Sequence, residues 1–262
     1  MTTLPKDESL GLLRWLVEAG ADEAALDMPV DRFAVPASAP SAARAAPRPA
    51  VVAAQSRTHT AAPSASREIA AACQTLDELK AALEAFDGCE LKRFAKHTVF
   101  ADGNPQAPIM FIGEAPGRDE DEQGLPFVGR AGKLLDRMLA AADLDRSKVY
   151  ITNVINWRPP QNREPTPEEA AACLPFLRRH IELAAPRILV MLGAVAARHV
   201  LGVTEGIMRL RGNWQVYQTG NRAIPVMPTL HPAYLLRQPS YKRLAWRDML
   251  AIIEKAKSLN NA

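Results

Sequence analysis

The hydrophobic pattern alternates between short apolar runs and longer amphipathic segments over most of the chain. Apolar runs of strand length lie at 107–113, 148–156, 187–193 and 223–232. Amphipathic segments of helical length lie at 130–144, 166–186 and 240–259. This alternation predicts an α/β fold in which a central four-stranded parallel sheet is flanked by helices on both faces, an α/β/α sandwich.

The chain before this alternation has a different pattern. The spacing of apolar residues at 6–20 predicts an amphipathic helix, so 1–20 is interpreted as an N-terminal helical element. Residues 21–67 form an Ala/Pro-rich segment that is interpreted as a disordered linker. A compact domain is expected at 68–262. The separate helix is a candidate docking element for a partner protein.

Composition narrows the class of protein. The 262 residues contain no run of eighteen apolar residues, the length that a transmembrane helix needs. The N-terminus lacks the pattern of a secretory signal. The three cysteines do not indicate a disulfide framework. We expect a monomer in the cytoplasm and no membrane partner.

Charge is distributed unevenly around a net value of +3. Segment 206–262 has nine Lys and Arg residues against two carboxylates, whereas loop 113–124 has five carboxylates and one Arg. A basic surface around an acidic pocket suits a polyanion. Solvated helix faces are often charged as well, so charge alone does not decide.

The acidic loop follows the first apolar run, where parallel sheets bind ligands. A glycine-rich turn there often holds phosphate, but five carboxylates would repel a polyphosphate. Glu114 is a candidate site residue, with a capping role as the alternative. The carboxylates at 119–122 are expected to be solvated or capping. Phe127 is either a core residue or a platform for a flat ring.

Two further groups of unusual residues follow later strands. Asn153 interrupts an apolar run, and its amide either matches the edge of a base or is satisfied by neighbouring backbone. His231 precedes a tip containing Tyr234, Leu235 and Arg237. That combination suits a side chain inserted into a base stack while an arginine contacts phosphate.

These groups belong to an ordered set of motifs that resembles a known family. The motifs are GEAPGRDEDEQGLPFVGRAG, YITNVINWRPPQNREPTPEEAAAC, LVMLG and TLHPAYLLR. In this order they resemble the uracil-DNA glycosylase superfamily, most closely its iron–sulfur class, family 4. The likeness runs from about residue 86 to about residue 250.

The resemblance implies that the ligand is a uracil flipped out of DNA. Glu114 would position or activate the attacking water, and His231 would stabilise the departing base at O2. Asp119 is the third candidate catalytic residue. Four residues would bind uracil: Ala115, Glu120 at the pocket mouth, Phe127 by stacking, and Asn153 by reading O4 and N3. Five residues are candidates for DNA contact: Arg130, Arg158, Tyr234, Leu235 and Arg237.

The expected activity is that of a monofunctional glycosylase, which leaves an abasic site for base excision repair. Hypoxanthine or xanthine is an alternative base, although the retained Asn153 favours uracil. A second alternative is a protein that binds or covalently traps uracil or abasic DNA without turnover. The chain lacks the histidine-bearing insertion of a crosslinking relative, so turnover is favoured.

The cysteines depart from the family pattern. The iron–sulfur class uses four cysteines, of which this chain keeps Cys89 and Cys173. Phe86 and Trp157 stand at the other two positions, and Cys73 does not have the spacing to replace either. Because two thiolates cannot hold a [4Fe–4S] cluster in the usual way, we expect no cluster, no other metal and no cofactor.

Overall fold

The computed structural model describes residues 62–220 and 222–260. The expected helix at 1–20 and most of the expected linker at 21–67 lie outside these residues. Helix α2 (Ala62–Ala72) begins inside the expected linker and continues past residue 68. Folded structure therefore starts earlier than the composition of the linker suggests.

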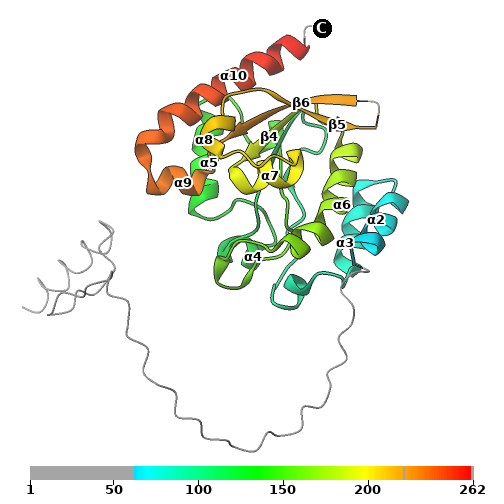
Figure 1. The fold of residues 1–262 in the computed structure, drawn as a ribbon. Helices are drawn as coiled ribbons and strands as arrows, with labels where there is room; N and C mark the ends of the chain where they lie inside the picture. Colours follow the sequence, from blue (N-terminus) through cyan, green and yellow to red (C-terminus); the bar gives the residue numbers. More distant parts are fainter. Residues whose placement is uncertain (1–61, 221, 261–262) are drawn as a thin grey trace, which may run out of the picture. The chain divides into compact units, whose positions relative to one another are not determined.

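The described residues form one six-stranded sheet in the order β1-β3-β2-β4-β6-β5 (Figure 1). The strands are β1 (Asp102–Gly103), β2 (Ile109–Gly113), β3 (Tyr150–Asn153), β4 (Ile188–Leu192), β5 (Gln215–Thr219) and β6 (Arg222–Thr229). The α-helices after α2 are α3 (Leu76–Ala85), α4 (Arg118–Gln123), α5 (Arg130–Ala140), α6 (Pro167–Ala184), α7 (Ala194–Leu201), α8 (Ile207–Leu210), α9 (Pro232–Arg237) and α10 (Lys242–Asn260). Short 3₁₀ helices are η2 (Glu90–Arg93), η3 (Arg146–Lys148), η4 (Pro160–Asn162) and η5 (Pro239–Tyr241).

The centre of the sheet confirms the expected parallel arrangement. β3, β2, β4 and β6 are the four apolar runs, and each neighbouring pair is parallel. The sheet also has two antiparallel edge strands that the prediction omitted, β1 on β3 and β5 on β6. β1 has only two residues, too few for a periodic signal. β5 pairs on one side only, and its side chains are half-buried or exposed.

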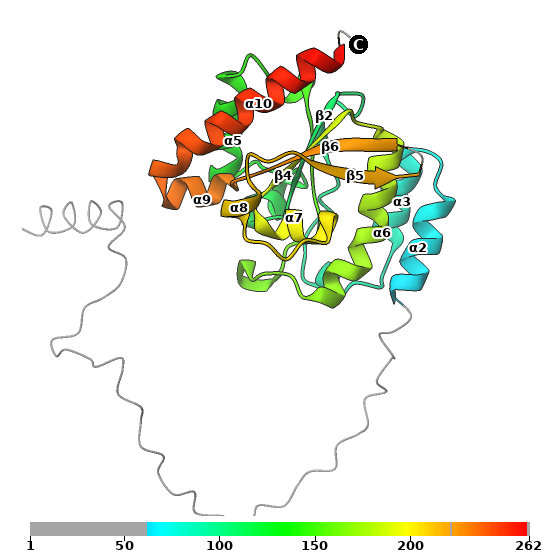
Figure 2. The same ribbon diagram turned by 45° about the horizontal axis from the view of Figure 1, so that its top comes forward.

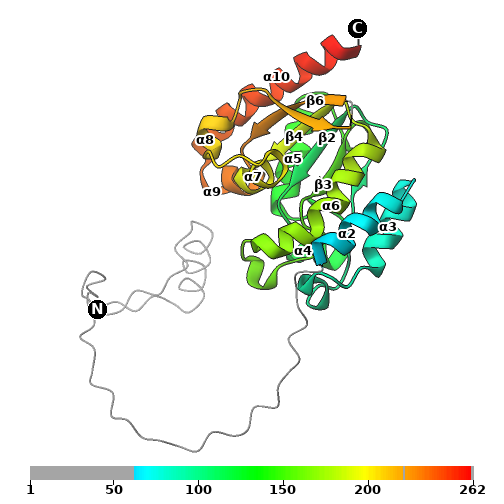
Figure 3. The ribbon, with the colours of Figure 1, turned by 45° about the vertical axis from the view of Figure 1, so that its right-hand side comes forward.

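Alternate residues of the central strands feed two separate layers. In β2, Met110 and Ile112 belong to the core under α2, α3 and α6, whereas Ile109 and Phe111 belong to the core under α5 and α10. This division follows from the two-residue period of a strand. Figures 1 and 2 show α5 and α10 on one side of the sheet and α6 on the other. Figure 3 shows α2 and α3 lying beside α6.

The start of α6 explains how the loop after β3 is fixed. The Thr166 hydroxyl accepts from the Glu169 amide at 3.3 Å, and the Glu169 carboxylate accepts from the Thr166 amide at 2.8 Å. Pro167 occupies the first helical position. This capping box satisfies two amides that a helix N-terminus leaves free.

In the part of the chain that the structure describes, no helix is long and apolar enough to cross a membrane.

Candidate active site

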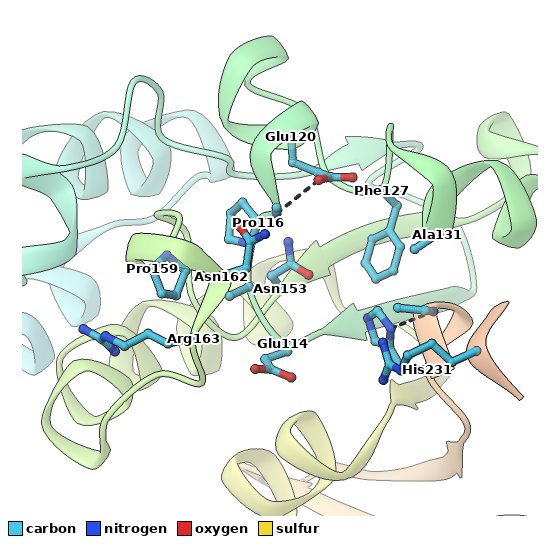
Figure 4. Close-up of a pocket in the computed structure, with 14 residues that line it drawn as sticks. Glu114, Pro116, Glu120, Phe127, Ala131, Asn153, Pro159, Asn162, Arg163 and His231 are labelled. Carbon is cyan, nitrogen blue, oxygen red and sulfur yellow. Dashed lines mark hydrogen bonds between the residues drawn. The ribbon is translucent and has the colours of Figure 1, made fainter. Parts of the chain in front are cut away.

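Loops after three central strands meet at one cavity of about 470 Å³. The loops follow β2, β3 and β6, whose carboxyl ends lie at the same edge of the sheet. In Figure 4, Glu114, Phe127, Asn153 and His231 surround a common space. The lining residues are Glu114, Ala115, Pro116, Gly117, Glu120, Phe127, Ala131, Asn153, Pro159, Asn162, Arg163, His231, Ala233 and Arg237. The sheet therefore brings together the three groups of residues that the sequence separates.

Two carboxylates of the acidic loop accept hydrogen bonds from the backbone. Glu120 accepts from the amides of Gly117, Val128 and Gly129 at 3.1, 3.0 and 2.8 Å. Asp121 is buried, and its carboxylate accepts from the Lys96 amide at 2.8 Å. These bonds hold the loop in place and correspond to the capping role that was expected. Asp121 is not solvated, because the chain before β1 covers it.

Phe127 holds its ring against the cavity from an unusual backbone conformation. Its φ is 55°, in the left-handed region that bulky residues rarely adopt. Gly132 permits this turn, because a Cβ there would lie 1.6 Å from the Phe127 carbonyl oxygen. The ring is buried, and its centroid lies 5.6 Å from that of His231 at an interplanar angle of 34°. Both rings thus border one flat space.

Asn153 ends β3 with a buried side chain that has no hydrogen-bond partner among the described residues. Its exposed fraction is 2%, and its Oδ1 is a buried acceptor without a donor. An unsatisfied buried acceptor costs about 1–3 kcal/mol. The amide faces the cavity, so a ligand that offers a donor beside an acceptor would remove this cost.

Gly113 keeps the space between Asn153 and Phe127 open. A Cβ at this position would lie 2.4 Å from Asn153 Oδ1 and 2.5 Å from Phe127 Cζ. We expect Gly113→Ala to lower the free energy of unfolding by about 1–3 kcal/mol through overpacking, as measured by urea denaturation. Gly206→Ala is the control, since its Cβ meets nothing within 4 Å and its φ is −69°. Equal losses in both variants would contradict this account.

His231 is the N-cap of α9, and this role determines which of its two ring nitrogens carries the proton. Nδ1 accepts a hydrogen bond from the Ala233 amide at 3.1 Å. Burial, assisted by the positive charge of Arg237, lowers the pKa of His231 to about 4. The ring is therefore neutral near pH 7, with its proton on Nε2. His231 presents a hydrogen-bond donor without a net charge.

Glu114 differs from Glu120 because its carboxylate makes no hydrogen bond to the described residues. It directly follows β2, and its backbone oxygen accepts from the Ile155 amide at 3.0 Å. Burial, and secondarily the charge of Glu164, raises the pKa of Glu114, while Arg198 opposes this rise. A partly buried carboxylate without a fixed partner is available to a ligand or a water molecule.

Several expected site residues lie outside the cavity lining. Asp119 is one of them: its side chain is 42% exposed and lies 3.6 Å from Arg118. Leu235 was expected as part of an exposed tip, but it is fully buried among Leu134, Leu230 and Ala245. The short helix α9 turns Leu235 inward, which corrects that expectation. Arg130, Arg158 and Tyr234 do not line the cavity either, whereas Ala115, Glu120 and Arg237 do.

Other lining residues were not singled out from the sequence. They are Pro116, Gly117, Ala131, Pro159, Asn162, Arg163 and Ala233. Asn162 follows Gln161, and both have left-handed φ values, 54° and 56°. Arg163 is held by the Glu169 carboxylate at 2.6 and 2.8 Å. The proline-rich stretch after β3 signalled a loop at this edge, but left-handed non-glycine residues leave no sequence signal for its course.

The four positions that correspond to cluster ligands all belong to one hydrophobic core. Cys89 and Cys173 are free, buried cysteines. Phe86 packs on Phe176, with ring centroids 5.1 Å apart. Trp157 is 1% exposed, and its Nε1 donates to Thr98 Oγ1 at 3.0 Å.

Comparisons with known proteins agree with the motifs. A model of the Uracil DNA glycosylase superfamily matches residues 100–250. The chain is 38% identical over 187 residues to a Type-4 uracil-DNA glycosylase of Sulfurisphaera tokodaii, covering 70% of this chain and 85% of that protein. It is 45% identical over 171 residues to a protein of the same name from Thermotoga maritima (65% and 86% covered). For the one from Archaeoglobus fulgidus, identity is 40% over 173 residues (64% and 87%).

These relatives contradict the expectation that the chain has no cofactor. They are Type-4 enzymes, the class to which the resemblance attaches an iron–sulfur cluster, so the expected absence is withdrawn. The two thiols and two aromatic side chains at the corresponding positions do not fit a four-thiolate cluster. The reaction is therefore assigned to the residues that line the cavity.

Proposed function

Because the chain belongs to the uracil-DNA glycosylase superfamily, we propose that it hydrolyses the bond between uracil and deoxyribose in DNA and leaves an abasic site. The observation that carries this proposal is the unsatisfied amide of Asn153 at the cavity. Uracil offers N3–H beside O4, a donor beside an acceptor. Asn153 Oδ1 would accept from N3–H while its Nδ2 donates to O4.

This reading of the base edge gives selectivity against cytosine. Cytosine has an acceptor at N3 and a donor at N4, the reverse of uracil. Its entry would leave the buried Asn153 amide unpaired, which sites of this kind reject strongly. The base must leave the stack to reach the cavity, and flipping costs least at a mismatched U·G pair. The Phe127 ring would stack on the flipped pyrimidine.

Bond cleavage places negative charge on the departing base and positive charge on the sugar. His231 would donate from Nε2 to O2 of uracil and so stabilise the first charge. Glu114 would stabilise the second and orient the attacking water, which supplies the hydroxyl of the abasic sugar. Among the described residues, no lysine lines the cavity. This supports hydrolysis by water rather than Schiff-base chemistry, and hence a monofunctional enzyme acting in base excision repair.

DNA would lie across the rim of the cavity. Arg237 is the exposed lining residue of α9 and is suited to contact a phosphate. Arg130, Arg158 and Tyr234 lie outside the lining and stay candidates for backbone contacts. Leu235 is excluded as an exposed wedge because it is buried. The role of 1–20 as a docking element for a repair or replication protein stays a proposal from the sequence.

A time course on labelled oligonucleotides tests the activity. The substrates contain U·G, U·A, single-stranded uracil or hypoxanthine, and alkali converts abasic sites to strand breaks. We expect many turnovers on uracil and little cleavage at hypoxanthine. No cleavage, together with retention of uracil DNA or a covalent protein–DNA band on a denaturing gel, would contradict the proposal.

His231→Asn tests the donor to the leaving base. The shorter amide can still accept from the Ala233 amide and cap α9, but it no longer presents Nε2–H. We expect kcat to fall by about 10²- to 10³-fold with a smaller change in KM, as measured by steady-state excision. His199→Asn is the control, since His199 is a half-buried residue of α7 outside the lining. An unchanged kcat in His231→Asn would exclude this role.

A further inference from the structure

The proposed stacking platform depends on a backbone conformation that does not maintain itself. Phe127 has a φ of 55°, and its carbonyl oxygen accepts a hydrogen bond from Arg146. A phenylalanine free to relax would leave the left-handed region. Its ring would then turn out of the plane that faces the base. Something in the fold must hold this carbonyl in place.

The Arg146 guanidinium supplies that restraint. It donates to the carbonyl oxygens of two successive residues, to that of Pro126 at 3.1 Å and to that of Phe127. The same guanidinium donates to the carboxylates of Asp102 and, at 2.9 Å, Asp136. These acceptors lie in β1, in α5 and in the turn that precedes α5. Arg146 itself belongs to η3 and does not line the cavity.

A second group, the Glu120 carboxylate, holds the turn from the other end of the same peptide group. Glu120 accepts from the amides of Val128 and Gly129, the two residues that follow Phe127. The peptide group between Phe127 and Val128 is therefore held at both ends, with its carbonyl oxygen on the Arg146 guanidinium and its N–H on the Glu120 carboxylate. Gly132 lies against the same carbonyl, since a Cβ at that position would be 1.6 Å from the Phe127 oxygen.

We propose that Arg146 is a positioning residue for base recognition, which acts by fixing the plane of the Phe127 ring. This inference rests on the proposed function, because it assumes that the ring stacks on a pyrimidine. A planar guanidinium can satisfy two adjacent carbonyls and two carboxylates together. A lysine ammonium cannot, because it is a single point of charge with three donors.

Arg146→Lys tests the proposal against a purely structural role. We expect kcat/KM for uracil excision to fall on the order of 10- to 100-fold. The loss should fall mainly on KM, and the inhibition constant of free uracil should rise, because stacking acts on the base in both ground and transition states. Arg179→Lys is the matched control and should retain activity. Arg179 also donates to a backbone carbonyl, that of Cys73 at 2.9 Å, and to a carboxylate, and its side chain is similarly exposed at 22% against 25%.

A double-mutant cycle with Phe127→Ala gives the decisive readout. If Arg146 acts through Phe127, Arg146→Lys should lose most of its effect once the ring is absent. Additive losses in the two variants, or no loss in Arg146→Lys, would overturn the inference. If circular dichroism shows that Arg146→Lys does not fold, Asp136→Asn replaces it, because loss of this carboxylate loosens the guanidinium that holds the two carbonyls. We then expect a smaller rise in KM of the same kind, and an unchanged KM would overturn the inference. Wild-type protein without activity on uracil would instead defeat the proposed function itself.

Discussion

Replacing Glu114 with glutamine should lower kcat for uracil excision by about 10²- to 10⁴-fold, the range of general acid–base catalysis. The amide keeps the size of the side chain but loses its charge and its ability to accept a proton. Because the Glu114 carboxylate makes no hydrogen bond to the described residues, the substitution breaks no contact of the fold. Single-turnover excision, with enzyme in excess over DNA, measures the effect on chemistry alone.

The pH dependence of the wild type should carry the signature of the same carboxylate. Burial raises the pKa of Glu114 above its ordinary value of 4.5, so the active ionised form is lost as pH falls through this raised pKa. His231 stays neutral down to about pH 4 and should not contribute above that pH. We therefore expect an acid limb in kcat whose midpoint lies above 4.5 and which is absent from Glu114→Gln.

Asp119→Asn is the matched control for this prediction. Asp119 lies in the same loop and was also a catalytic candidate, but its carboxylate is exposed beside Arg118 and outside the cavity lining. We expect its kcat and its acid limb to resemble those of the wild type. A large loss in Asp119→Asn with little change in Glu114→Gln would transfer the role of activating water to Asp119.

The meeting of the three loops was predictable because it follows from chain topology alone. Glu114, Asn153 and His231 each come at or just after the end of a strand, and parallel strands place those ends at one edge. The short edge strands β1 and β5 were not predictable, since neither forms an apolar run. The burial of Leu235 depends on the direction in which α9 leaves the strand end. That direction is set by contacts with Leu134 and Leu230.

The acidic loop shows where residue type is an insufficient guide. Its carboxylates were expected to be solvated or to cap nearby amides, and the sequence does not say which of them do so. Glu120 and Asp121 accept hydrogen bonds from backbone amides of segments on either side of α4. Glu114 alone of the lining carboxylates keeps its oxygens free of such bonds. The chemistry of the site therefore depends on which carboxylates the backbone has already engaged, and this appears only after folding.

Residues that support a site, such as Arg146, are also difficult to predict from the sequence. It lies far along the chain from Asp102 and Phe127, and nothing in its local sequence distinguishes it from other surface arginines. The left-handed conformation of Phe127 was equally hidden, because glycine is the residue that usually signals such a turn. Sequence motifs located the groups that touch the base, but not those that hold them in position.

Asn153→Ala should abolish recognition of uracil and leave stability almost unchanged, whereas most substitutions of buried residues mainly lower stability. We expect excision of uracil to fall by about 10³-fold or more, because the variant can no longer pair with N3–H and O4. The free energy of unfolding should hardly change, since the free protein leaves Oδ1 of Asn153 buried and without a donor. Urea denaturation and single-turnover excision on the same preparation measure both quantities.

Asn156→Ala is the matched control three positions along the same segment. Asn156 is also buried, but its Nδ2 donates to the Val99 carbonyl at 3.0 Å, and it does not line the cavity. Its removal should lower the free energy of unfolding by about 1–3 kcal/mol, because that carbonyl loses its partner, while folded protein keeps its activity. Asn153→Asp, of equal size, should lose uracil excision like Asn153→Ala, since a carboxylate repels O4. If Asn153→Ala lost stability but retained activity, the unsatisfied amide would have no part in reading the base. Recognition by the proposed mechanism would then be excluded.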